Sequence, residues 1–316
     1  MKPTEFWKNF KLGEELSVSG TFIYNGLRQF HEMPTLDYTD ELFDFLYSLS
    51  VGLERLLKIV VVLLEHDDRV NQEDLEKSLI THSHQDLLRR VNVHQTLNLG
   101  PPHNEFLALL GTFYRTLRYD RFSLSSVYDA HRERRDLCAF IGKHLNIEIK
   151  EEPSGILATK NEDRYRKFVR RVVTKISSEL YAVVRARARE LNLYTYELRH
   201  DSKAQTVFLG QADVAAEEVL WKELLVFLMN TKSSSGWLEF LRGIEPLPFD
   251  QELIGDYLQC FQSNAAKATV MGELETLYDQ VKDSGQRLEM MSLLGSSGVY
   301  FDEPEAEDTD ELDGPD

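Results

Sequence analysis

The stretch TDELFDFLYSLSVGLERLLKIVVVLL, residues 39–64, decides the fold of this chain. Its apolar residues recur every three or four positions, which is the spacing of one face of an α-helix. Asp37 or Thr39 is a suitable N-cap, and Glu54 and Lys58 are spaced to pair along the helix. The stretch therefore predicts one long amphipathic helix, with an apolar stripe formed by Leu42, Leu46, Leu49, Leu53, Leu56, Leu57, Val60 and Leu64.

Helical spacing continues on the C-terminal side of this stretch. We expect a second helix at about 71–91, a third that begins at Asn104 after the break LGPP (99–102), and a fourth at about 125–144. Residues 151–155 (EEPSG) are charged and then turn-forming, which indicates a boundary between domains. Beyond them we expect a basic helix and then three more, at about 163–191, 213–230, 250–262 and 265–290.

These patterns predict an all-α fold, in which an up-and-down helical bundle is followed by a second helical region. Residues 194–198 (YTYEL) and 206–209 (TVFL) could pair as a small β-hairpin. The predicted parts are an entry segment at 1–36 with a short helix at 21–32, a bundle at 37–150, a C-terminal helical region at 151–294 and an acidic tail at 295–316, which we expect to be disordered.

Composition and charge narrow the class of protein. The chain of 316 residues has two cysteines, Cys138 and Cys260, which excludes a disulfide framework and a cysteine-rich zinc site. It has no apolar run long enough to cross a membrane and no secretory signal at its start, so we expect a soluble cytoplasmic protein without a membrane partner. Phosphate-binding glycine loops and zinc-protease or serine-hydrolase motifs are absent from the sequence, so we expect no metal and no cofactor.

The net charge of −17 is unevenly distributed. Nine acidic residues and no basic one lie between Asp302 and Asp316, whereas residues 160–190 carry ten basic and four acidic residues. The basic segment is either a solvated helix face or a surface that binds phosphates through residues such as Arg164, Lys167, Arg170 and Arg171. The tail is either a solvating segment or a mimic of nucleic acid that screens this helix.

Three short segments carry a resemblance to a known family. They are GLERLLK (52–58), HSHQDLL (82–88) and FYRTLRYD (113–120). In their order and spacing they resemble the motifs of the HEPN superfamily, a group of helical nucleotide-binding domains. The second segment departs from the family's His-Asp-Leu pattern, because Gln85 stands between His84 and Asp86. The resemblance covers about residues 37–148 and implies a helical bundle that pairs as a homodimer.

The resemblance also implies action on RNA or a nucleotide, as in metal-independent ribonucleases of antiphage defence. In such enzymes histidine moves the ribose 2′-hydroxyl proton and arginine stabilises the charged phosphorus centre. By position Arg118 is the family's arginine, but Ser123, Leu124 and Ser125 stand where its histidine is expected.

Two other histidines are therefore candidates for the catalytic histidine. His131 could reach Arg118 from the next helix, and His84 shares an apolar face with Leu87, which favours a packing role. The candidate binding residues of the bundle are Arg55, Lys58, Tyr119 and Arg121, which could equally pair with acidic neighbours. We expect a catalytically degenerate module that binds RNA or a nucleotide. The alternatives are an active ribonuclease and a helical scaffold for a protein partner.

Overall fold

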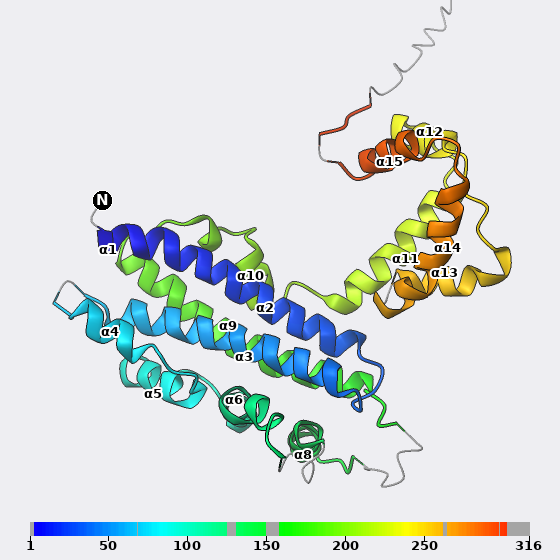
Figure 1. Ribbon diagram of the computed structural model, residues 1–316. Coiled ribbons are helices and arrows are strands. Elements are labelled where there is room, and N and C mark those ends of the chain that lie inside the picture. The colour runs from blue at the N-terminus through cyan, green and yellow to red at the C-terminus, as the bar shows by residue number, and fades with distance from the viewer. Residues whose placement is uncertain are drawn as a thin grey trace, which may run out of the picture. The chain divides into compact units, whose positions relative to one another are not determined.

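The computed structural model describes residues 3–67, 69–124, 131–149, 158–261, 264–296 and 298–301. It divides into two compact units, Met1–Ala215 and Ala216–Asp316, which are described separately (Figure 1). The prediction of an all-α fold is confirmed, because the described residues form helices and no strand; an isolated bridge joins Thr35 and Lys160. Within the same residues, no helix is both long enough and apolar enough to cross a membrane.

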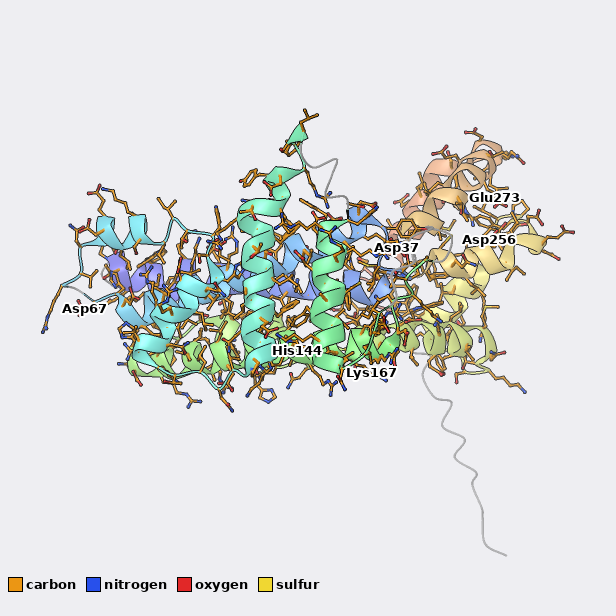
Figure 2. All side chains as sticks on the ribbon, turned by 90° about the horizontal axis from the view of Figure 1, so that it is seen from below. Asp37, Asp67, His144, Lys167, Asp256 and Glu273 are labelled. Atoms are coloured by element: carbon orange, nitrogen blue, oxygen red, sulfur yellow. The ribbon has the colours of Figure 1, made fainter. Side chains whose placement is uncertain are left out.

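The first unit is built around the helix that the quoted stretch predicts, α3, which lies between α2 and a row formed by α5, α6 and α8 (Figure 1). The long helix α9 also packs along α3. In Figure 2, α6 runs beside α8, the helix that carries the labelled His144. The elements of this unit are α1 (Pro3–Phe6), η1 (Trp7–Lys11), α2 (Leu12–Glu32), α3 (Thr39–Glu65), α4 (Gln72–Ser78), α5 (His84–His94), α6 (Pro101–Thr112), η2 (Phe113–Leu117), α7 (Arg118–Asp120), α8 (Arg132–Leu145), α9 (Asp163–Glu190), η4 (Tyr196–Leu198) and α10 (Lys203–Phe208).

The apolar surface of α3 extends beyond the predicted stripe. Five consecutive residues, Ile59 to Leu63, are all buried, so this stretch of the helix is covered on every side. A helix that is apolar all round belongs in the interior of a protein. The first unit therefore places α3 at the centre of its core, and the other long helices cover it.

The N-terminal region belongs to this core and is not a separate entry segment. Where a short helix was expected at 21–32, α2 extends from Leu12 to Glu32 and packs along α3. Its glycines do not break the helix but allow close contact. A Cβ atom on Gly26 would lie 2.7 Å from the Leu49 side chain, and one on Gly52 of α3 would lie 2.7 Å from Ile23.

The basic helix α9 also belongs to the first unit, so the division of the chain falls later than the predicted boundary near residue 150. Its beginning is tied to the corner between α2 and α3. The side-chain amide of Asn161 donates to the carbonyl oxygens of Phe30 and Met33, at 2.7 and 3.1 Å. The Leu36 amide donates to the carbonyl of Thr159 at 2.8 Å.

The expected β-hairpin is wrong. Residues 196–198 form a 3₁₀ turn, and residues 203–208 form α10, which begins at the N-cap Ser202. Ala204, Val207 and Phe208 are buried and are spaced three and four positions apart. This helical spacing, which packs α10 against α2 and α9, outweighs the strand preference of Thr206, Val207 and Phe208.

The predicted second helix is divided into α4 and α5. Asn71 caps α4, and the Ser83 hydroxyl accepts a hydrogen bond from the Asp86 amide to cap α5. Residues 79–83 leave the helix between them, and the side chain of Ile80 is 83% exposed instead of packing on an apolar face. Two N-cap residues in one predicted helix thus start two helices.

The second unit is described by α11 (Val214–Asn230), α12 (Gly236–Gly243), η5 (Gln251–Leu253), α13 (Ile254–Cys260), α14 (Asn264–Gln280) and α15 (Ser284–Leu293). Helix α12 was not predicted from the sequence, and α14 and α15 were predicted as one helix. Trp221 of α11 stacks on Phe261 at 5.3 Å between ring centroids. Most of the predicted acidic tail at 295–316, namely residues 297 and 302–316, lies outside the described residues, as does the start of the expected fourth helix, 125–130.

The close approach of α2 and α3 can be tested with Gly52→Ala. Although alanine favours a helix, its Cβ would meet Ile23, so we expect the free energy of unfolding to fall by about 1–2 kcal/mol. Gly20→Ala is the matched control, because its nearest neighbour, Ala204, would lie at an ordinary 3.4 Å. Urea unfolding followed by circular dichroism measures both. Equal stability of the two variants would contradict the close packing.

Candidate functional site

The three segments of the HEPN resemblance meet at one place in the first unit. Helix α3 supplies Glu54 and Lys58, the connection between α4 and α5 supplies His82, and η2 and α7 supply Tyr114 and Arg118. We call these five residues the Arg118 cluster. Glu54 contacts His82, the His82 ring contacts Tyr114, and the Tyr114 ring contacts Arg118. The chain of contacts therefore passes through all three segments.

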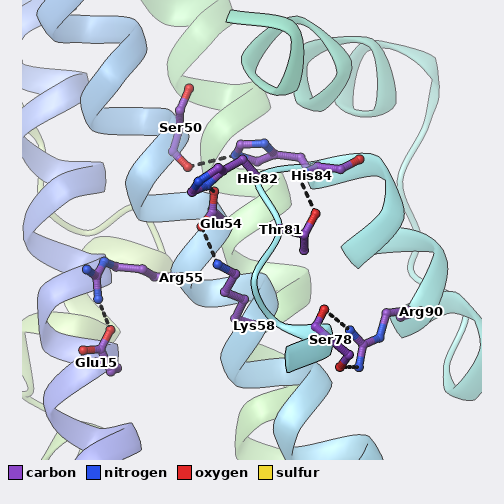
Figure 3. A network of polar contacts seen from close by, with 11 residues as sticks. Glu15, Ser50, Glu54, Arg55, Lys58, Ser78, Thr81, His82, His84 and Arg90 are labelled. Carbon is purple, nitrogen blue, oxygen red and sulfur yellow. Dashed lines mark hydrogen bonds and ion pairs between the residues drawn. The ribbon is translucent and has the colours of Figure 1, made fainter. Parts of the chain in front are cut away.

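Glu54 is the buried acid of this cluster. Its side chain is 8% exposed, and each carboxylate oxygen has a partner (Figure 3). One oxygen accepts from Lys58 Nζ at 2.6 Å, and the other lies 3.0 Å from His82 Nδ1. A carboxylate in this position requires such partners, because removal from water is costly without them. Glu54 thus fixes the positions of both Lys58 and His82.

His82 has the arrangement of an oriented base. Because an ionised carboxylate only accepts hydrogen bonds, Nδ1 carries the proton toward Glu54. In the neutral ring, Nε2 then holds a lone pair that can accept a proton. The His82 side chain is 49% exposed, so solvent or a ligand can reach it. A carboxylate that holds a histidine in one tautomer is a common arrangement in acid–base catalysis.

Arg118 is held by aromatic rings. Its guanidinium carbon lies 3.8 Å from the ring centroid of Tyr114 and 4.5 Å from that of Tyr119, and Nη2 donates to the Tyr119 hydroxyl at 2.8 Å. Among the described residues, no carboxylate pairs with Arg118. Stacking orients the guanidinium without neutralising it, so its charge remains available to an anion.

Tyr114 stays protonated in this environment. Burial raises the pKa of its hydroxyl above the ordinary value, and the negative charge of Glu54 raises it further, while Arg118 acts in the opposite direction. Its position in η2 depends on a π-helical turn at Phe113–Leu117, between α6 and α7. Such turns are frequent at functional sites because they redirect the side chains that follow.

The other predicted cations of the bundle are paired with acids. Arg55 pairs with Glu15 of α2, and Arg121 donates to Glu133 at 3.0 Å. Lys58 is occupied by Glu54, and Tyr119 is 60% exposed beside Arg118. Of the four predicted cations, only Arg118 therefore keeps its charge without an acidic partner in the part of the chain that the structure describes.

The basic helix is also partly neutralised. Arg164 pairs with Glu162 at 2.7 Å, Lys167 with Asp163 at 2.7 Å, and Arg170 with Asp213 at 2.5 Å. Arg171 is exposed and donates to the backbone of Lys167. The first half of α9 therefore resembles a solvated helix face more than a phosphate-binding surface.

The two candidate catalytic histidines lie elsewhere. His131 is exposed at the start of α8, and no contact joins it to Arg118 among the described residues. His84 is fully buried, and its Nε2 donates to the Ser50 carbonyl at 2.8 Å (Figure 3). Burial lowers the pKa of His84, and no substrate can reach a side chain with no exposed surface. His84 therefore serves the packing of α5 on α3.

His82 lies inside one of the three quoted segments but was not among the predicted site residues. The expected helix at 71–91 placed residue 82 on an ordinary helix face. The polar run Thr81-His82-Ser83, with Ser83 as an N-cap, was the signal that the helix ends before it. Among the described residues, no group of three or more His, Cys, Asp or Glu side chains is placed to hold a metal ion.

Comparison with known proteins assigns no family to this chain. No protein-family model, no curated protein and no solved structure matches the chain.

The burial of His84 predicts how stability depends on pH. The unfolded chain takes up a proton at this histidine near its ordinary pKa of 6.5, while the folded chain resists protonation to lower pH. Unfolding therefore binds protons in that window, and stability falls as the pH falls through 6.5. We expect His84→Gln, which keeps a donor for Ser50, to lose less stability than the wild type between pH 7.5 and 5.5.

The difference in that loss should reach about 1 kcal/mol, because one pKa unit corresponds to 1.4 kcal/mol. Urea unfolding at the two pH values measures it. Identical pH dependence in His84→Gln and the wild type would contradict a neutral, buried His84.

Proposed function

We propose that this chain is a HEPN-like protein that binds RNA or a nucleotide through its phosphate groups at the Arg118 cluster. One observation carries the proposal: the three segments that resemble the family, separated by 23 and 24 residues, converge on one group of side chains. An unneutralised, stacked arginine is suited to a phosphate, because its donors form a fixed fork. The exposed ring of Tyr119 offers a surface on which a base can stack.

Binding can be tested with Arg118→Ala and a labelled single-stranded RNA. Loss of one phosphate contact should weaken binding and lower the slope of log affinity against log salt by about 0.7. Arg115→Ala is the matched control, because Arg115 lies one turn earlier and outside the stack of tyrosine rings. Fluorescence anisotropy at several salt concentrations measures both variants. The same slope in Arg118→Ala and Arg115→Ala would contradict the assignment of Arg118.

A second candidate function, metal-independent cleavage of RNA, is supported by the contact between Glu54 and His82. His82 Nε2 would take the proton of a ribose 2′-hydroxyl, and the resulting oxygen would attack the adjacent phosphorus. The bond from phosphorus to the 5′-oxygen would break, and that oxygen would take a proton from water. The products are a 2′,3′-cyclic phosphate and a 5′-hydroxyl. Arg118 would stabilise the charge on the phosphorus centre.

Cleavage in the presence of EDTA tests this candidate. We expect His82→Gln to lower the rate at least 100-fold, because acid–base groups contribute about 10²–10⁴-fold. His94→Gln controls for the loss of a histidine, and circular dichroism confirms folding of each variant. Unchanged cleavage in His82→Gln would show that His82 is not the base. Salt-dependent binding without cleavage by the wild type would support the degenerate, binding role.

A scaffold for protein partners is the remaining alternative, and the surface of α11 favours it. Several large apolar side chains of this helix are about half exposed or more, including Leu220, Leu224, Phe227 and Met229. Beside Arg118, Phe122 and Leu124 are 90% and 88% exposed. We propose that Phe122 and Leu124 belong to a second apolar surface. This surface would support the pairing of two bundles that the resemblance implies. Absence of any RNA or nucleotide binding would leave the scaffold role.

A further inference from the structure

A pocket of about 390 Å³ lies at the C-terminal end of α9, outside the region that resembles the HEPN family. Three arginines line it, Arg185 and Arg189 from α9 and Arg199 from the segment after η4. Tyr194 and Tyr196 also line it, and these side chains are 81% and 58% exposed. No acidic residue is among the lining residues of this pocket, which we call the arginine pocket.

These three arginines differ from the remaining cations of α9, each of which pairs with an acid or, for Arg166 and Arg171, donates to a backbone carbonyl. Arg164, Lys167, Arg170 and Lys175 pair with acids along the first half of the helix, and Arg187 pairs with Glu190. Among the described residues, no carboxylate pairs with Arg185, Arg189 or Arg199. Three positive charges around one small space repel one another, and an anion in that space would relieve the repulsion.

The negative end of the helix dipole does not account for this arrangement. Cations in the last turn of a helix are favourable because they face the last carbonyl groups. That effect could explain Arg189, which lies in the last turn of α9, whereas Arg185 lies before that turn. It does not explain Arg199, which comes from a different element and lies over the Tyr196 ring, with its guanidinium carbon 5.6 Å from the centroid.

The pocket is held in place by contacts with the core. The Tyr194 amide donates to Asn9 Oδ1 at 3.0 Å, and the Tyr181 and Ser202 hydroxyls donate to the Glu197 carbonyl at 3.1 and 2.7 Å. The backbone between α9 and α10 is therefore fixed at both ends. A ligand that enters does not need to order this segment first, which favours binding.

Apart from Thr195, the remaining lining is apolar. Ala188, Leu193 and Leu198 line the pocket together with the hydrophobic parts of the tyrosines. Inorganic anions gain nothing from such a surface, whereas an aromatic base gains from both the apolar side chains and the tyrosine rings. The volume lies within the range of sites for small molecules, about 300–1,000 Å³. The lining is thus suited to a ligand with both a flat ring and several negative charges.

We propose that the arginine pocket binds a nucleotide with two or more phosphates, with its base against Tyr194 or Tyr196 and its phosphates on Arg185, Arg189 and Arg199. Arginine forks match phosphate oxygens, and three forks suit a polyphosphate better than a single phosphate. This site does not depend on the Arg118 cluster, because no residue belongs to both.

Isothermal titration of the full chain with ATP in EDTA tests the proposal, with tripolyphosphate and adenosine as separate probes. We expect ATP to bind more tightly than either part. Arg189→Ala should weaken ATP binding about tenfold, as expected for loss of a charged hydrogen bond. Tyr194→Ala should weaken ATP binding and leave tripolyphosphate binding unchanged; Tyr196 is kept, because its ring contacts Arg199.

Arg171→Ala is the matched control, since Arg171 is an exposed arginine of the same helix without an acidic partner among the described residues, and lies outside the pocket. Its ATP affinity should equal that of the wild type. Arg118→Ala should also leave ATP binding at this site unchanged, which separates this proposal from the one for the Arg118 cluster.

Three results would overturn the proposal. They are no binding of ATP at millimolar concentration, equal loss in Arg189→Ala and Arg171→Ala, and equal affinity for ATP and tripolyphosphate. Equal affinity for ATP and tripolyphosphate would show that the pocket binds polyanions without contacting the base. Circular dichroism of each variant distinguishes a lost site from a lost fold.

Discussion

The burial of α3 on all sides is the constraint on which the first unit depends. A helix with apolar residues at five consecutive positions, 59–63, cannot be covered by one neighbour, because successive residues point in different directions around the axis. The covering helices come from distant parts of the chain: α2 precedes α3, α5 and α6 follow it, and α9 begins nearly 100 residues after α3 ends. The first 215 residues therefore form one unit, and a boundary at residue 150 would leave one side of α3 exposed.

The same burial creates the Arg118 cluster. Two polar groups of α3, the backbone carbonyl of Ser50 and the carboxylate of Glu54, are buried within its otherwise apolar surface. The Glu54 carboxylate is paired with Lys58 and with His82 of the connection between α4 and α5 (Figure 3). The Ser50 carbonyl accepts a hydrogen bond from the buried His84, the first residue of α5. The interruption of the helix at 79–83 thus places both histidines against α3. His84 forms a hydrogen bond inside the core, and His82 remains accessible to solvent.

The sequence predicted the parts of the fold that depend on periodicity. The stripe of Leu42 to Leu64 located α3, and the end of the fourth helix near Asn146 is confirmed by its left-handed backbone there. Features that depend on tertiary contact were not predictable in this way. The sequence predicted only a short helix at 21–32, because the close contacts of Gly26 with Leu49 and of Gly52 with Ile23 exist only after α2 and α3 pack. Residues 206–209 suggested a strand, because burial of Phe208 against α9 is not visible in local preferences.

The candidate sites show the same division between local and tertiary information. The basic character of residues 160–190 is visible in the sequence. Whether each cation is available to bind an anion, however, depends on whether an acid lies beside it. Arg170 is paired with Asp213, which lies 43 residues away in the chain, and Arg55 is paired with Glu15, 40 residues away. Arg118, held by aromatic rings, and the three arginines of the pocket are not compensated by acids among the described residues. In an acidic protein, whose carboxylates neutralise many of the cations, the positions that escape pairing are more informative about anion binding than the number of basic residues.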